Sequence, residues 1–344
     1  NVRSIIASHS VYDIGVPIRI AISKNIPAYV VDIIFLNFFD KKRIFEVDSK
    51  AYGEYFENLN EDQRQKAIEI SKKQLDAKFK INNGYASSTE LYQSSTPSVI
   101  QDQKYETFGQ IKNKNIFLKN NKPNILITAH CFYDSPHAVA NLLFSDFYEW
   151  IKHLGELSNE TDYNWYIKKH PHTNNKNLNN KVLDSLVKKY PKLIILDEKI
   201  NNSELINNGI DLALTVYGSV GYEFPYFNIP VLIASNKTSY EDYNFCIQPK
   251  NLKEYDYFIK NISKIKLDIN RDEIYKFYFN RYLASWSLLD DYVKNKISLK
   301  NEFFGPKILD VWMKQFKLEK IEKINFEILE FIKQKKYRLI SKNA

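Results

Sequence analysis

Two short segments about forty positions apart hold the residues best suited to chemistry. Residues 167–172 read IKKHPH, and residues 217–223 read YGSVGYE directly after the apolar run at 212–216. A glycine-rich turn between a strand and a helix presents backbone N–H groups to an anion, and the positive end of the helix dipole lies behind them. Because a helix is predicted to begin near Val220, this turn predicts a site for the phosphate of a nucleotide.

Two further polar segments come after apolar runs. Residues 130–137 (HCFYDSPH) come after the run at 124–129, and residues 8–15 (SHSVYDIG) come after the run at 2–7. Ligands of α/β proteins bind beside the carboxyl ends of parallel strands, so polar side chains here are candidates for contacting substrate. These candidates are His130, His137, His9, Tyr12, Asp13 and, slightly further along, Arg19. The alternative is that Ser10 and Asp13 cap the following helix and that His9 is an ordinary loop residue.

The elements that must position these residues alternate regularly from residue 124 to residue 235. Apolar runs predict strands, and the segments between them predict helices. The strands are at 124–129, 164–168, 193–196, 212–216 and 229–233, and the helices are at 138–154, 181–190 and 203–208. Such alternation over short connections predicts a parallel sheet with right-handed crossovers and helices on both faces.

The first 120 residues predict a second α/β unit. They contain a strand at 2–7, a loop at 8–15, a helix at 17–24, a strand at 28–35 and a helix at 59–80 with Asn60 as its N-cap. Residues 82–122 are polar and lack periodicity, so we expect irregular structure that ends in a linker. The predicted fold is therefore α/β, with Rossmann-like domains at 1–120 and 121–295 and C-terminal helices at 296–344.

The C-terminal region after residue 252 is predicted to be helical, with long segments at 271–296 and 306–339. The last segment is amphipathic and basic. Such a helix can lie on an anionic membrane surface, or its apolar stripe can pack on the protein's own core. We favour packing, because any surface helix is amphipathic, and we keep peripheral membrane contact as the alternative.

The composition excludes several classes of protein. The net charge of +8 is spread over a chain of 344 residues, without a concentrated basic face before the C-terminus, so we expect no nucleic-acid partner. Cys131 and Cys246 are far apart, which favours neither a zinc site nor a disulfide. No run reaches the roughly 18 to 20 apolar residues that cross a bilayer, and no signal peptide is visible. We therefore expect a cytoplasmic protein.

Taken together, IKKHPH at 167–172, the turn at 217–223 and the segment NIPV at 228–231 resemble a known family. They are similar to the capsular-polysaccharide and surface-carbohydrate glycosyltransferases with a His-Pro motif, which include the Kdo transferases and, more distantly, bacterial sialyltransferases and CDP-glycerol polymerases. The resemblance covers roughly residues 124–235, and Lys169 stands where the family usually has proline. It implies a GT-B fold, in which two Rossmann-like domains face a cleft.

The resemblance also implies an activity. The expected reaction moves a nucleotide-activated sugar, with CMP-Kdo or a related CMP-ulosonic acid as the best candidate, onto a capsule or other surface glycan or glycolipid. It implies no metal and no cofactor beyond the nucleotide-sugar donor, which acts as co-substrate.

The resemblance implies roles for individual residues. His170 would contact the donor phosphate, Ser219 would bind phosphate through its hydroxyl and N–H, and Glu223 would accept hydrogen bonds from the ribose. The other expected nucleotide-binding residues are Lys168, Pro171, Tyr217, Gly218, Val220 and Gly221. Lys168, Lys169 and His172 are also candidates for pairing with the carboxylate of an ulosonic acid. The alternatives are a histidine bonded to backbone at 170 and, at Glu223, a carboxylate favoured by the helix dipole.

Glycosyl transfer also needs a carboxylate, as a base or as a nucleophile. Asp134 is the first candidate, because its loop should face the same crevice as His170, and Asp13 is the second. The alternative for Asp134 is a turn or capping residue. His130, Asp134 and His137 are possible metal ligands by type, but Pro136 interrupts the helix that would aim them, so we predict no metal site.

Other functions share these features. The enzyme alternatives are transfer of glycerol phosphate from CDP-glycerol, transfer from a UDP- or GDP-sugar, and a sugar-nucleotide epimerase of the same fold. A non-catalytic scaffold of a capsule-assembly complex is the alternative outside enzymes, and the basic C-terminal helix would then be the interacting part.

Overall fold

The computed structural model describes residues 2–31, 36–45, 53–79, 115–170, 176–284, 318–335 and 339. The chain divides into two compact units, each of which is described by itself. The first unit comprises residues 1–44, 87–104 and 280–344, and the second comprises residues 45–86 and 105–279. Residues 45–86, which we expected in the N-terminal domain, belong to the second unit. The facing of two domains across a cleft stays a prediction.

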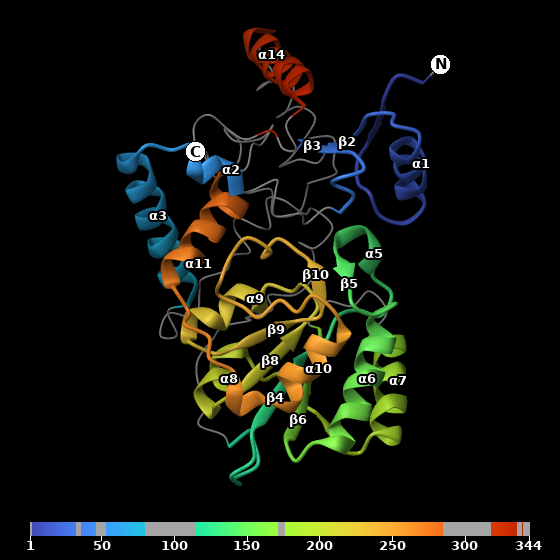
Figure 1. The fold of residues 1–344 in the computed structure, drawn as a ribbon, viewed down its shortest axis with the longest axis vertical. Helices are drawn as coiled ribbons and strands as arrows, with labels where there is room; N and C mark the ends of the chain where they lie inside the picture. The colour runs from blue at the N-terminus through green and yellow to red at the C-terminus, as the bar shows by residue number, and fades with distance from the viewer. Residues whose placement is uncertain are drawn as a thin grey trace. The chain divides into compact units, whose positions relative to one another are not determined.

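The second unit contains a parallel five-stranded sheet (Figure 1). Its strands are β4 (Asn124–Thr128), β6 (Asn164–Lys168), β7 (Leu193–Ile195), β8 (Leu212–Thr215) and β9 (Val231–Ile233), in the order β7-β6-β4-β8-β9. Ile125 pairs with Trp165 of β6 and with Leu212 of β8, so these strands end at the same level. The predicted parallel sheet is confirmed, and its strands begin and end within two residues of the predicted positions.

Helices α6 (Phe147–Glu160), α7 (Lys176–Lys189), α8 (Asn202–Asn208) and α10 (Leu252–Lys260) accompany the sheet. Side-chain caps fix the beginnings of α6, α8 and α10: Asp146 accepts the N–H of Glu149, Asn201 forms a capping box with Glu204, and Asn251 accepts the N–H of Glu254. Gly209, with φ of 89°, ends α8 in a conformation that glycine adopts at little cost. The short connections between strands and helices result from these caps.

The predicted helix at 138–154 is wrong. The structure has a single turn, α5 (Pro136–Val139), then a two-residue strand, β5 (Asn141–Leu142), and only then α6. β5 pairs antiparallel with β10 (Ser235–Lys237), an element that sequence analysis missed. The cap at Asp146 sets the start of α6. The backbone at 141–142 is extended because it pairs with β10, which comes much later in the chain.

The helix predicted to begin near Val220 is much shorter than expected. α9 (Val220–Glu223) has four residues and is followed by the 3-10 turn η3 (Pro225–Phe227). Pro225 has no N–H to continue the α-helical hydrogen bonds. The dipole of one turn is small, so the anion site that we predicted at residues 217–223 depends on individual N–H groups.

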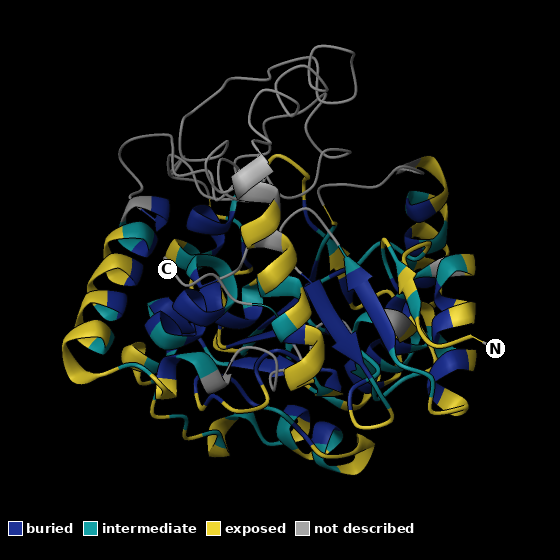
Figure 2. Cartoon of the chain, turned by 90° about the horizontal axis from the view of Figure 1, so that it is seen from above, coloured by how far each residue is buried: buried dark blue, intermediate teal, exposed yellow. Residues whose placement is uncertain are grey.

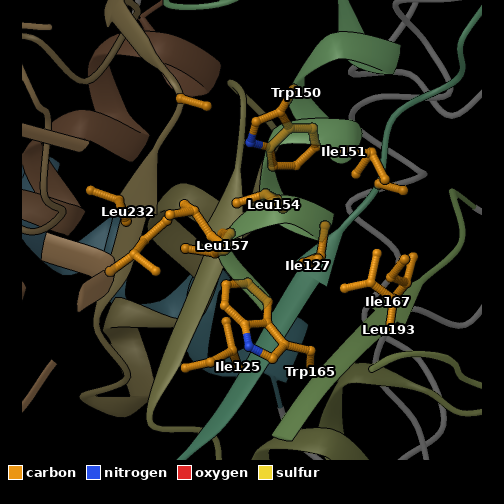
Figure 3. Packing of buried hydrophobic residues seen from close by; sticks show 14 of the residues in the cluster. Ile125, Ile127, Trp150, Ile151, Leu154, Leu157, Trp165, Ile167, Leu193 and Leu232 are labelled. Carbon is orange, nitrogen blue, oxygen red and sulfur yellow. The ribbon is translucent and has the colours of Figure 1, made fainter. Parts of the chain in front are cut away.

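The core of the second unit lies between the sheet and α6 (Figure 3). Trp150 and Trp165 are fully buried there, and the indole N–H of Trp150 donates to the hydroxyl of Tyr255 at 2.9 Å. Gly155 allows α6 to approach α7, because a Cβ at this position would lie 2.3 Å from the ring of Tyr190. Burying large apolar side chains at about 25 cal/mol per Å² stabilises the strands that end at the site.

Helices before and after the sheet also belong to the second unit. They are α2 (Gly53–Glu57), α3 (Glu61–Phe79), η4 (Ile262–Lys264) and α11 (Arg271–Tyr278). The π-helical segment η5 (Phe279–Leu283) follows α11 and, after Phe279, belongs to the first unit. Asn60 caps α3, as predicted, by accepting the N–H of Gln63 at 2.9 Å. The ring of Phe79 lies 4.7 Å from that of Tyr226, so the end of α3 packs against the segment that comes after α9.

The first unit contains a three-stranded sheet of β1 (Ile5–Ala7), β2 (Ala28–Val31) and β3 (Leu36–Phe39). β1 and β2 are parallel, and β3 is antiparallel to β2. α1 (Tyr12–Ser23) begins within the segment that we predicted as a loop at 8–15 and contains Pro17. Gly15 is required there, because a Cβ would lie 2.2 Å from the carbonyl oxygen of Ser10.

The C-terminal helix α14 (Leu318–Gln334) packs within the first unit. Phe331 is buried with Tyr29, Leu36 and Phe38 of β2 and β3, as the packing interpretation predicted. Figure 2 shows the helices striped, with buried residues on one side and exposed residues on the other. None of the helices in the described ranges is long and apolar enough to cross a membrane.

Several predicted segments lie outside the described residues. They are 32–35 of the second strand, most of the irregular region at 82–122, residues 285–296 and 306–317 of the long C-terminal helices, Pro171, His172 and the side chain of Tyr12.

Candidate functional site

The carboxyl ends of three neighbouring strands bring the predicted residues together. His130 comes two residues after β4, His170 two residues after β6, and Tyr217 two residues after β8. The rings of His130 and His170 are nearly parallel, with centroids 6.4 Å apart, and the ring of Tyr217 lies 4.7 Å from that of His130. The sequence predicted this meeting, because polar segments follow the apolar runs and the carboxyl ends of parallel strands hold the ligands of α/β proteins.

The neighbours of His130 fix where its proton lies. The hydroxyl of Thr215 accepts the N–H of Gly218 at 3.2 Å, and its oxygen lies 3.2 Å from Nε2 of His130. The N–H of Val216 points to the same Nε2 at 3.3 Å. Nε2 therefore accepts hydrogen bonds, and the proton of the neutral ring is on Nδ1.

His130 is also held uncharged. Its ring stacks on Phe147, with centroids 4.8 Å apart and an angle of 7° between the planes. Burial of the ring, and then the nearby charge of His170, lowers the pKa of His130 to about 3. A neutral imidazole with a fixed tautomer acts at neutral pH as a hydrogen-bond donor, whereas it cannot act as a cation.

The turn after β8 leaves two backbone donors unused. The carbonyl oxygens of Gly218 and Ser219 accept the N–H groups of Gly221, Tyr222 and Glu223. Within the described part of the chain, no hydrogen bond takes the N–H of Ser219 or of Val220. Gly218 has little room for a side chain, because a Cβ would lie 2.9 Å from the Thr215 hydroxyl and 3.6 Å from the ring of His130. Two adjacent N–H groups without a partner among the described residues, in a turn close to His130, form a suitable anion site.

Two lysines precede His170. Nζ of Lys168 donates to the carbonyl oxygen of Ile200 at 3.0 Å and to Oδ1 of Asn202 at 2.7 Å. Burial lowers the pKa of Lys168 to about 8, although the charges of Glu223 and Glu204 oppose this shift. Nζ of Lys169 lies 3.7 Å from a carboxylate oxygen of Glu198. Positive charge is thus held at the end of β6.

Glu223 lies in a buried ion pair that sequence analysis did not anticipate. Its Oε1 accepts from Nζ of Lys78 at 2.7 Å, and Nζ also donates to the hydroxyl of Tyr222 at 2.7 Å. The side chains of Lys78 and Glu223 are 5% and 4% exposed. The position of Lys78 could have indicated this pair. Lys78 comes three residues after Leu75 and therefore lies on the apolar face of α3, where a lysine needs a partner.

The loop between β4 and α5 contains the first carboxylate candidate. Asp134 is exposed, and its Oδ1 accepts the N–H of Ser135 at 2.8 Å. Within the described residues it makes no hydrogen bond to His130 or His170. The loop is anchored by Asn179 of α7, a residue that sequence analysis missed, which accepts the N–H of Phe132 at 2.8 Å. His137 is exposed in α5.

The remaining candidates belong to the first unit. Nδ1 of His9 is buried without a hydrogen-bond partner among the described residues. Asp13 is exposed in the first turn of α1, where its Oδ1 accepts the N–H of Ile14 at 3.1 Å, so it is not the N-cap. Arg19 is half-buried, and burial lowers its pKa. The predicted substrate-binding role of these residues stays a prediction.

No metal centre is formed by the described residues, because no three or more His, Cys, Asp or Glu side chains among them are grouped to hold an ion.

No family model and no curated protein matches the sequence. Among solved structures, the chain is similar to KpsC of Thermosulfurimonas dismutans, a β-Kdo 2,4-transferase. The identity is 13%, the match covers 84% of this chain and 85% of that one, and the TM-score is 0.44.

Two further structures match over a smaller share of their own length. MnaA of S. aureus, solved with UDP, is 17% identical over 70% of this chain and 54% of that one, with a TM-score of 0.33. The wall teichoic acid polymerase TagF is 15% identical over 71% and 49%, with a TM-score of 0.32. This chain therefore spans about half the length of these two proteins. The matched structures are GT-B fold proteins.

Proposed function

We propose that this chain is a glycosyltransferase that takes a sugar from a nucleotide donor, with CMP-Kdo or a related CMP-ulosonic acid as the best candidate. The acceptor would be a capsule or other surface glycan or glycolipid. The observation that carries the proposal is that no described residue accepts from the N–H groups of Ser219 and Val220, in the turn whose Gly218 lies close to the ring of His130. These groups suit the phosphate of a leaving nucleoside monophosphate.

The proposed roles depend on where charge develops. When the bond between the sugar and the phosphate breaks, negative charge grows on the phosphate, and hydrogen-bond donors already in place stabilise it. The N–H groups of Ser219 and Val220 and the hydroxyl of Ser219 would provide fixed donors. His170, which lies beside the neutral His130, would supply the histidine contact to the phosphate.

The lysines before His170 would act mainly through their charge. Two of the three ammonium protons of Lys168 are directed to Ile200 and Asn202, and Lys169 is paired with Glu198. A positive potential at the end of β6 suits both the phosphate and the carboxylate of an ulosonic acid. For Glu223, whose Oε1 is held by Lys78, we assign the ribose hydrogen bond to Oε2.

A carboxylate completes the proposed reaction. Asp134 comes after β4 in the same unit as the phosphate site, and we propose it as the nucleophile of a double displacement. Asp13 lies in the first unit, and we propose it as the alternative, a base that acts on the acceptor hydroxyl.

The first test is a thermal-shift measurement with CMP, CDP, UDP and GDP, with cytidine as the control that lacks phosphate. We expect CMP to raise the melting temperature and cytidine to raise it less, because a ligand that binds only the folded state stabilises it. If no nucleotide stabilises the protein, the proposal fails. Stabilisation by UDP alone would instead support a UDP-sugar transferase or an epimerase.

Transfer of glycerol phosphate from CDP-glycerol is the second candidate, because it also releases CMP and would use the same donors at Ser219 and Val220. Thermal shift does not separate these two activities, whereas incubation with each donor does. We expect CMP release from CMP-Kdo and none from CDP-glycerol.

A further inference from the structure

Beneath the turn lies a tyrosine that sequence analysis did not single out. The hydroxyl of Tyr240 donates to the carbonyl oxygen of Gly218 at 2.8 Å. Tyr240 is only 2% exposed, its N–H donates to the hydroxyl of Thr238 at 3.1 Å, and its carbonyl oxygen accepts from Nε2 of Gln248 at 2.6 Å. These two hydrogen bonds hold the backbone of Tyr240 in place and so fix the position from which its hydroxyl reaches Gly218.

The ring of Tyr240 packs closely against Gly221 of the turn. A Cβ at Gly221 would lie 2.5 Å from Cε2 of this ring and 3.0 Å from its hydroxyl oxygen. On another side the ring packs against Phe277, with centroids 5.0 Å apart, and against Phe245, with centroids 5.7 Å apart. Because protein interiors are close-packed, the ring has little freedom to follow a movement of the turn.

The hydrogen bond to Gly218 sets the direction of a neighbouring donor. The carbonyl of Gly218 and the N–H of Ser219 belong to one peptide group, and in a trans peptide they point in opposite directions. No cis peptide occurs in the described ranges. The carbonyl of Gly218 accepts both the hydroxyl of Tyr240 and the N–H of Gly221, so the N–H of Ser219 faces away from these two donors.

The other side of Gly218 is fixed as well. Its N–H donates to the hydroxyl of Thr215, which in turn faces Nε2 of His130. Thr215 thus fixes the peptide group before Gly218, and Tyr240 fixes the peptide group between Gly218 and Ser219 through its carbonyl. A donor that is already oriented loses less conformational entropy when an anion binds, which strengthens binding.

We propose that Tyr240 is a positioning residue that aims the N–H of Ser219 at the phosphate of the nucleotide donor. The proposal rests on the phosphate site proposed above. It concerns the phosphate alone, so the contribution of Tyr240 depends on whether the ligand carries one.

The test compares Tyr240→Phe with the unchanged protein by calorimetric titration of CMP and of cytidine. A hydrogen bond contributes about 1 kcal/mol, which corresponds to about a 5-fold change in affinity. We expect Tyr240→Phe to weaken CMP about 3- to 10-fold and to leave cytidine unchanged. Tyr243→Phe is the matched control. Tyr243 packs on the same Phe277 ring, and removing its hydroxyl leaves the hydrogen bond from Tyr240 to Gly218 in place.

A second measurement observes the peptide itself. Gly218-Ser219 is the only Gly-Ser pair in the sequence, so labelling glycine carbonyls with ¹³C and serine with ¹⁵N isolates the Ser219 amide in an NMR spectrum. We expect this signal to move when CMP is added. In Tyr240→Phe it should start from a different position, because one of the two hydrogen bonds to the Gly218 carbonyl is lost, and it should move less.

The outcomes separate the two proposals. If Tyr240→Phe leaves both the CMP affinity and the Ser219 signal unchanged, or weakens CMP and cytidine equally, Tyr240 is not a positioning residue. If the Ser219 signal of the unchanged protein does not respond to CMP, the proposed phosphate site fails. In that case a Ser219 signal that is also identical in Tyr240→Phe overturns the orienting role of Tyr240.

Discussion

At the scale of single residues, the candidate site contains a histidine that is uncharged at neutral pH. Thr215 and Val216 direct hydrogens at Nε2 of His130, and burial lowers the pKa of His130 to about 3. Two imidazoles with centroids 6.4 Å apart would repel each other if both were charged. A neutral His130 removes this repulsion.

The first prediction concerns the titration of His130. In the unfolded chain its imidazole has a pKa near 6.5. Below that pH the unfolded state binds a proton that the folded state does not bind. The contribution of His130 to the free energy of unfolding is therefore complete above pH 6.5 and declines towards pH 3, by up to about 1.4 kcal/mol per pH unit. ¹⁵N NMR of labelled histidines should show one ring protonated on Nδ1 and unchanged from pH 8 to pH 5.

His130→Gln serves as the control for this prediction. The amide oxygen of the glutamine can accept the same two hydrogen bonds but does not titrate, and the spectrum of the variant identifies the lost histidine signal. Between pH 7.5 and pH 5, the stability advantage of the unchanged protein over His130→Gln in urea unfolding should fall by about 2 kcal/mol. A His130 signal that titrates near pH 6.5 would contradict the prediction.

At the scale of elements, the sequence predicted the features that depend on local pattern. Apolar runs located every strand of the five-stranded sheet, and polar residues after β4, β6 and β8 indicated the candidate site. The errors occurred where a segment outside the local pattern determines the secondary structure. β5 exists because β10 pairs with it, and α9 stops because Pro225 begins a 3-10 turn. Tyr240 and Lys78 were missed because only the folded chain brings them to the turn.

The second prediction concerns the ion pair that joins α3 to α9. Lys78→Met would leave the carboxylate of Glu223 buried without its partner, which costs about 3–5 kcal/mol. The double variant Lys78→Met with Glu223→Gln should recover much of that loss, because no buried charge remains. Urea unfolding of the three proteins measures the difference.

The matched control is Lys72→Met, on the exposed face of the same helix, which should change stability little. Equal stabilities of Lys78→Met and Lys72→Met would show that Glu223 is solvated in solution.

At the scale of the whole molecule, the predicted residues are divided between two units with separate cores. His130, His170, the turn after β8 and Asp134 belong to the second unit, whereas His9, Asp13 and Arg19 belong to the first. The sequence predicted two α/β units because the strand and helix pattern appears twice. The sequence analysis placed α3 in the N-terminal domain, whereas it belongs to the second unit. An amphipathic pattern shows that one face of a helix is buried and does not show which segment covers it.

The third prediction uses this division to find the reacting carboxylate. If Asp134 is the nucleophile, it acts on the donor whether or not an acceptor is bound. Asp134→Ala should then abolish both the slow hydrolysis of CMP-Kdo and the transfer of the sugar, and leave the affinity for CMP unchanged, since Asp134 does not belong to the phosphate site. CMP release with and without acceptor measures both reactions.

Asp13→Ala is the matched comparison, because Asp13 is likewise exposed near the end of a strand but lies in the other unit. A base that acts on the acceptor hydroxyl is needed for transfer and is dispensable for hydrolysis. If Asp13→Ala stops transfer while hydrolysis continues, and Asp134→Ala slows neither reaction, the base is Asp13 and the reaction is a single displacement. The anomeric configuration of the product then has to be inverted, which gives an independent check on which carboxylate reacts.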